Sequence, residues 1–160
     1  MTTEVTLKMV LDQWNNSIKT CSELLNGLSD ETLEKEIVPG KNRGIYILGH
    51  LIAVHDEILV LLDLGEKLYP ELYEPFLNSP DKAFSEIPTV TELRRYWLNQ
   101  CEVLKQKFSN LKTLEWFEKH SAVSAEDFIN QPHRNKLNVV LTRATHVQYH
   151  IGQLQLIKQP

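Results

Sequence analysis

Apolar residues recur at steps of three and four along four stretches of the chain, a spacing typical of helices that bury one face. The first predicted helix spans about Glu4 to Leu28, and the second, which is more apolar, spans Gly44 to Leu64. The third begins near Thr89 or Thr91, either of which is a candidate N-cap. The fourth begins near Asn135 and runs to about Lys158.

Two long segments, 65–89 and 112–134, lack this periodicity. The first contains four prolines but also four aromatic residues, which argue against a disordered linker. A connection of this length in a small domain usually crosses the domain or covers a site. The second contains a predicted helical turn from Ala125 to Ile129. Because no repeat or convincing strand is found, the pattern predicts an all-α four-helix bundle.

Length and composition narrow the class of protein. With 160 residues, of which 42% are hydrophobic, we expect one domain spanning residues 1–160. The net charge of −4 gives no reason to expect nucleic-acid binding. No secretory signal is evident, and Cys21 and Cys101 form no Cys-x-x-Cys pattern, so we expect a cytoplasmic protein with buried thiols. Polar residues such as Asp56 interrupt the apolar run from Ile45 to Leu64, which therefore predicts a core helix and no membrane span.

The histidines offer the clearest candidate chemistry. His146 and His150 are four residues apart, so on a helix they differ by about 40° and about 6 Å and can face one ion. Alternatively, both are ordinary, partly buried histidines that hydrogen-bond to neighbouring groups. A metal site would need a further donor from elsewhere in the chain. His120 and His133 lie in polar irregular segments, where we expect exposed side chains.

The second predicted helix offers two further histidines. His50 and His55 are five residues apart, which is about 140° around a helix, so only one of them can face the same ion. His50 has apolar helical neighbours, whereas His55 precedes an aspartate and is predicted nearer the polar flank, so His50 is the better third ligand. Glu57, on the stripe of His50, and Tyr149, beside the pair, are candidate catalytic groups. A surface glutamate and a packed tyrosine are the simpler interpretations.

Two motifs together resemble the DinB-like superfamily: Leu48-Gly49-His50-Leu51 in the second predicted helix, and His146 to Gln153 in the fourth. The resemblance extends over nearly the whole chain. It implies a four-helix bundle of up–down–down–up topology, with a long crossover between helices two and three. It also implies that His50, His146 and His150 bind a divalent metal, with zinc or nickel expected, and that the protein is a homodimer.

The resemblance leaves the activity open. Three imidazoles leave at least one coordination place on a metal for water or substrate, so chemistry can occur there. The leading hypothesis is a metal-dependent enzyme acting on a small molecule, either a transferase that uses a low-molecular-weight thiol or a hydrolase. The alternative is a noncatalytic metal- or ligand-binding protein of the stress response. The family's name refers to DNA damage, which concerns induction and does not imply contact with DNA.

Overall fold

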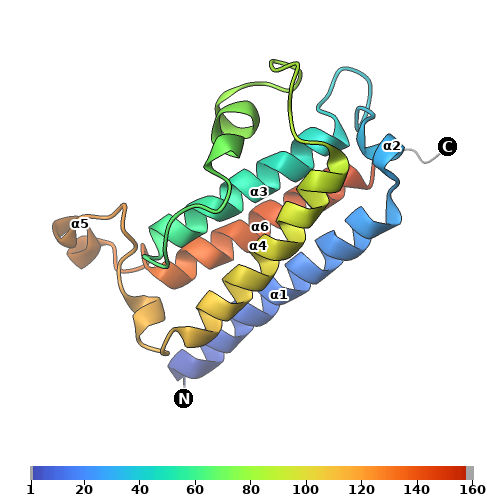
Figure 1. Ribbon diagram of the computed structural model, residues 1–160. Coiled ribbons are helices and arrows are strands. Elements are labelled where there is room, and N and C mark those ends of the chain that lie inside the picture. Colours follow the sequence, from blue (N-terminus) through green and yellow to red (C-terminus); the bar gives the residue numbers. More distant parts are fainter. Residues whose placement is uncertain (1, 158–160) are drawn as a thin grey trace.

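A computed structural model describes residues 2–157, and these adopt an all-α fold (Figure 1). Within this range no β-strand forms, and only two isolated bridges occur. The long helices are α1 (Thr2–Gly27), α3 (Gly44–Leu61), α4 (Val90–Asn110) and α6 (Lys136–Leu154). The short ones are α2 (Asp30–Leu33), η1 (Pro70–Leu72), η2 (Glu74–Asn78), η3 (Glu115–Phe117) and α5 (Ala125–Asn130). The prediction of an all-α fold is confirmed.

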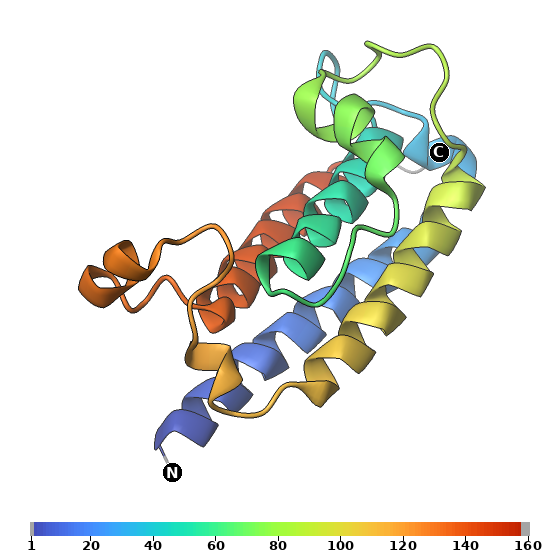
Figure 2. The ribbon, with the colours of Figure 1, turned by 60° about the vertical axis from the view of Figure 1, so that its left-hand side comes forward.

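Two hydrophobic clusters fill the space between the long helices. One joins the later part of α1 and α6 to the early part of α3 and α4, through residues that include Leu25, Leu48, Leu93 and Leu154. The other joins the opposite ends, through residues that include Trp14, Leu59, Leu104 and Val140. In Figures 1 and 2, α1 and α6 accordingly run in one direction, and α3 and α4 run in the other.

Because α3 and α4 begin at the same end of the molecule, residues 62–89 must return along its length (Figure 2). This segment contains the 3₁₀ turn η1 and the π-helix η2, both of which contact α3. Leu72 and Phe76 are completely buried in it. Leu72 and Phe76 thus extend the core, whereas Tyr73 and Phe84 of the same segment are exposed.

The helix ends differ from the predicted ones for local reasons. α3 ends at Leu61, three residues early, and Asp63 just beyond it has a left-handed backbone with φ of 58°. Thr89 caps α4 in a reciprocal capping box with Glu92, whereas Thr91 instead donates a hydrogen bond to Asp30. α6 ends at Leu154, so the predicted end of the last helix at Lys158, a position outside the described residues, is wrong by four residues.

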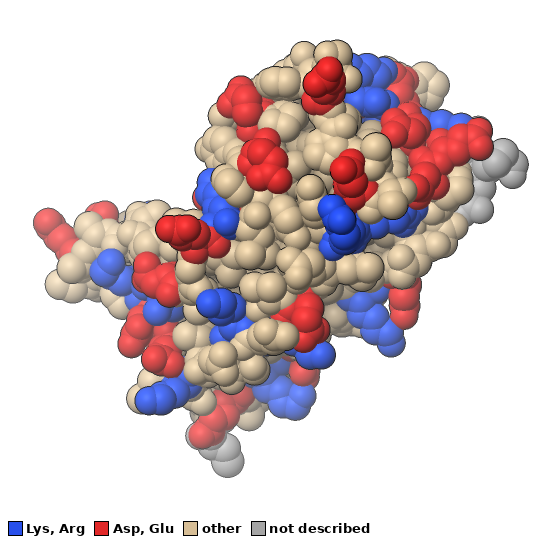
Figure 3. Space-filling model, viewed as in Figure 1, with Lys and Arg blue, Asp and Glu red and all other residues tan. Residues whose placement is uncertain are grey.

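The surroundings of α3 confirm the prediction of a core helix. By length and composition α3 could cross a membrane, but 72% of it is buried inside the protein. In contrast, the segment around α5 projects from the body of the molecule, and none of the α5 residues is buried (Figure 1). On the face in Figure 3, acidic and basic side chains are intermingled around apolar and neutral ones.

Gly49 explains how the π-helix comes so close to α3. A Cβ atom at this position would lie 2.4 Å from Cε1 of Phe76, closer than side-chain carbons approach each other. Phe76 is completely buried and cannot swing into solvent. The glycine in the Leu-Gly-His motif therefore makes room for the ring of Phe76.

We predict that Gly49→Ala destabilises the protein by about 1–3 kcal/mol, because overpacking outweighs the gain of up to about 1 kcal/mol in helix propensity. The matched control is Gly152→Ala in α6, where nothing lies within 4 Å of the added Cβ. This control should leave stability unchanged or raise it. Urea unfolding of both variants provides the measurement, and equal stability of the two would contradict the steric argument.

Candidate metal centre

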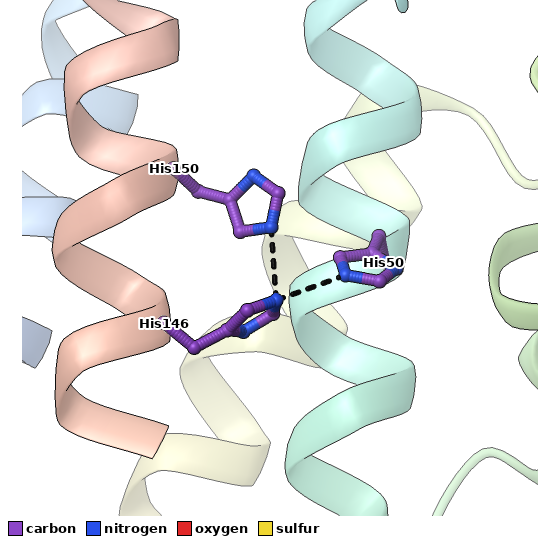
Figure 4. A group of neighbouring side chains, drawn as sticks. All are labelled: His50, His146 and His150. Carbon is purple, nitrogen blue, oxygen red and sulfur yellow. Dashed lines mark hydrogen bonds between the residues drawn. The ribbon is translucent and has the colours of Figure 1, made fainter. Parts of the chain in front are cut away.

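Three histidines from two helices meet at one point in the structure (Figure 4). His50 projects from α3, while His146 and His150 project from successive turns of α6. The Nε2 atom of His146 lies 3.2 Å from that of His50 and 3.0 Å from that of His150. One nitrogen from each ring lies within 4.8 Å of the others, so the group could hold a metal ion.

Hydrogen bonds on the far side of two rings fix which nitrogen carries the proton. Nδ1 of His50 lies 2.9 Å from the carbonyl oxygen of Phe76, and this oxygen can only accept. Nδ1 of His150 lies 2.7 Å from Oε1 of Gln153, whose amide nitrogen donates to the hydroxyl of Tyr149. Both Nδ1 atoms therefore carry protons, and both Nε2 atoms present lone pairs to the centre.

These lone pairs make the centre suited to a cation. A neutral His146 can donate from Nε2 to only one of the other two rings, so at least one inward lone pair is left without a hydrogen bond. A tetrahedral zinc ion with bonds of about 2.0–2.1 Å would separate its nitrogen ligands by about 3.3 Å. The measured separations of 3.0 and 3.2 Å are close to this value. The donor set thus fits a divalent transition metal.

The surroundings of the three histidines disfavour protonation of their rings at neutral pH. Burial, and then the charges of the neighbouring histidines, lower the pKa of His146 to about 4. Burial and the field of His50 lower the pKa of His150 to about 4. Burial also lowers the pKa of His50, and Arg143 adds to the effect. Three neutral imidazoles are the form that binds a metal ion.

The returning segment is fastened to the start of α3, and this holds Phe76 in place. Arg43, the N-cap of α3, donates its backbone N–H to Oδ2 of Asp81 at 2.8 Å, and its guanidinium donates to Oδ1 at 2.7 Å. Tyr46 donates its hydroxyl to the carbonyl of Ser79 at 2.7 Å. The Arg43 side chain makes no capping hydrogen bond, and the Asp81 carboxylate instead accepts a backbone N–H at the start of α3.

A pocket of about 220 Å³ opens onto His50 and His150. It is lined by Asn42, Tyr46, Ile47, His50, Leu77, Tyr149, His150 and Gln153. None of these lining residues carries a permanent charge. Tyr149 lies at the mouth with 63% of its surface exposed, and its ring is 5.0 Å from that of His150. The pocket gives a small molecule access to the centre.

The two candidate catalytic residues occupy different surroundings. Tyr149 lines the pocket, as described above. Glu57 does not line it and forms an ion pair with Lys67. Glu57 also raises the pKa of Arg143, which burial lowers.

Two expectations about other histidines are wrong. His55 is completely buried, with its ring 5.0 Å from Trp14 and 5.3 Å from Trp97, and Asp56 beside it is also buried. The predicted polar flank does not exist, because α3 is buried on most of its circumference. His120 is partly buried, whereas His133 is exposed as expected.

Of the two groups that orient the histidines, only Gln153 could be found from the sequence. Gln153 lies three residues after His150, a helical neighbour position that an i, i+3 search would find. The partner of His50 is a backbone carbonyl, at Phe76, and so leaves no mark on residue identity. The π-helix that presents this carbonyl is a form often found at functional sites, but the spacing of apolar residues does not predict it.

The fold and the site define an all-α protein with an accessible three-histidine centre. The sequence model of the DinB superfamily matches residues 13–154, and the chain belongs to that superfamily. No curated protein matches the chain. A crystal structure of a conserved protein from Enterococcus faecalis resembles it with a TM-score of 0.55 and 13% identity, covering 94% of this chain and 95% of that one. At this identity the likeness concerns the fold.

We predict that the metal-free protein loses stability as the pH falls from 7 to 5.5. Above about pH 6.5 the histidines are neutral in both states. Below about pH 6.5 the histidines of the unfolded chain bind protons. In the folded chain His146 and His150 have pKa values of about 4 and do not yet bind them, so the folded state loses stability until the pH falls through about 4. Urea unfolding at the two pH values tests this prediction before most carboxyl groups titrate. Equal or greater stability at pH 5.5 would show that the rings are protonated in the folded state.

Proposed function

We propose that the protein binds one divalent transition metal, zinc or nickel, through His50, His146 and His150, and that it is a metal-dependent enzyme. The observation that carries this proposal is the convergence of the three rings, two of which have Nδ1 held by a hydrogen-bond acceptor. Membership of the DinB superfamily supports it. The pocket over the rings supports a small-molecule substrate.

The reaction that we propose is a transfer to or from a low-molecular-weight thiol, ahead of hydrolysis. A divalent ion in this place would supply Lewis acidity, which lowers the pKa of a coordinated water or thiol and polarises a carbonyl. The chain's own part is to hold neutral ligands in position and to line the approach. Among the described residues, both cysteine thiols are raised in pKa to about 12 by burial, so neither is suited to act as a nucleophile.

Tyr149 and Glu57 would have different roles in this proposal. The Tyr149 hydroxyl accepts a hydrogen bond from Gln153 at 3.0 Å and keeps its own proton to donate towards the pocket. Glu57 pairs with Lys67 and interacts with Arg143, so we assign it to balancing charge near the centre instead of to proton transfer.

The remaining parts of the proposal concern the whole molecule. We propose the up–down–down–up four-helix bundle as its topology, which the two hydrophobic clusters and the long return segment support. A cytoplasmic homodimer that is induced by DNA damage, without contact to nucleic acid, completes the proposal. The mostly buried α3 is consistent with a protein that does not enter the membrane.

The second candidate function is a noncatalytic protein of the stress response, in which the metal or a small ligand holds the helices together. The position of the centre supports it, because the three histidines tie α3 to α6. Ion binding at such a place stabilises the folded state by mass action whether or not turnover occurs.

We predict that the protein, purified without a histidine tag, contains about one zinc or nickel ion per chain. His146→Ala should lose this ion because only two ligands remain. His133→Ala, at an exposed histidine outside the centre, is the matched control and should keep full occupancy. Elemental analysis of the three proteins gives the measurement, and full occupancy in His146→Ala would remove the proposed site.

We predict metal-dependent turnover with thiol-acceptor electrophiles, and slower turnover with activated esters or amides. Tyr149→Phe should lower kcat by about 10²-fold or more because it removes the donated proton, and metal content should be unchanged because Gln153 still accepts from Nδ1 of His150. Rates are compared for the loaded enzyme, the metal-free enzyme and this variant. Rates at background level in all the screens would favour the noncatalytic function.

A further inference from the structure

A single strip along the body of α3 reaches solvent, and it carries His50. Between positions 44 and 59 the residues that are not buried are Tyr46, His50 and Glu57. Spacings of four and seven residues put all three on one face of the helix. The strip therefore leads from the pocket, which Tyr46 lines, past the metal centre to Glu57.

Arg143 lies on α6 beside this strip. It precedes His146 by three residues and His150 by seven, so it differs from them by about 60° and about 20° around the helix. Along the axis it is about 4.5 Å from His146. Because α3 and α6 run in opposite directions and His50 meets His146, Arg143 is opposite the residues that follow His50 (Figure 2). The arginine thus lies between the centre and Glu57.

The guanidinium of Arg143 has no ion pair or hydrogen bond among residues 2–157. Its Nε is buried without an acceptor, whereas its terminal nitrogens are not among the buried atoms and so reach solvent. Glu57, whose charge raises the pKa of Arg143, forms its ion pair with Lys67 instead. An arginine offers five N–H donors in a planar fork, and here all five are available to a ligand.

Positive charge would accumulate at this place once a metal is bound. Three neutral imidazoles do not cancel the charge of a divalent ion, and Arg143 adds a further charge beside it. Burial is the main cause that lowers the pKa of His50 and of His146, and the field of Arg143 adds to both effects. An anion that reaches the metal and the guanidinium together would be stabilised by both.

We propose that Arg143 binds a carboxylate of the substrate while another atom of the same molecule coordinates the metal. A carboxylate fits because its two oxygens match the parallel N–H groups of the guanidinium fork. One helical turn separates Arg143 from His146, which suits a molecule with a few bonds between its two binding groups. The pocket, lined by uncharged residues, would hold the rest of the substrate. This inference rests on the proposed function.

The test compares 3-mercaptopropionate with 3-mercapto-1-propanol, two thiols that differ only in the group at the far end. Calorimetry measures their binding to the zinc-loaded wild type, Arg143→Gln and Arg95→Gln. We expect Arg143→Gln to weaken binding of 3-mercaptopropionate by about 10-fold or more, because a charge-assisted pair is lost, and to change binding of the alcohol by less than about threefold. Arg95→Gln, at an exposed arginine of α4, is the control and should bind both thiols as the wild type does. Equal losses for the two thiols in Arg143→Gln, or the same losses in Arg95→Gln, would overturn the inference.

A second measurement does not depend on metal binding. Propionate is added to the metal-free wild type, and the arginine Nε–H signals are followed in ¹⁵N spectra. The signal of Arg143, identified by its absence in Arg143→Gln, should shift, whereas that of Arg95 should stay in place. Equal shifts of the two signals, or no shift of Arg143, would contradict carboxylate binding. If the wild type bound no zinc, the proposed function would fail, and this titration alone would decide the role of Arg143.

Discussion

The direction of the imidazole lone pairs is the constraint on which the centre depends. Phe76 and Gln153 each accept an Nδ1 proton, so that His50 and His150 must present Nε2 inwards. A neutral His146 can donate from Nε2 to only one of these lone pairs, whereas a cation can accept both, and burial keeps the proton from being that cation near neutral pH. The preference of the centre for a metal ion therefore depends on Phe76 and Gln153, which hold the rings and are not themselves ligands.

Long-range contacts hold these groups in place. Gln148 on α6 donates to Ser17 on α1 at 2.9 Å, which ties the helix of His146 and His150 to its parallel neighbour. The return segment is tied to α3 by Asp81, and Gly49 lets Phe76 approach. The α6 pair is local in sequence, whereas His50 is oriented by a residue 26 positions away. The centre is thus complete only when the tertiary fold is complete.

The periodic pattern was sufficient to predict the long helices, and the i, i+4 spacing was sufficient to bring His146 and His150 together. The choice of His50 agrees with its position beside them, but the reason given for setting His55 aside was wrong. That reason assumed a polar flank, whereas 13 of the 18 residues of α3 are buried, and a helix buried on nearly all sides shows no such flank. The carbonyl of Phe76 could not be predicted, since backbone atoms are common to all residues.

Two residues that line the pocket lie outside the helices that carry the histidines. The three rings stand on the bodies of α3 and α6, whereas Asn42 and Leu77 at the rim belong to a connecting segment and to the π-helix. Replacements or insertions in the connecting segment can reshape the rim while the helix bodies stay as they are. A lineage built on this plan can diversify the lining of the pocket while it inherits the same three-histidine centre.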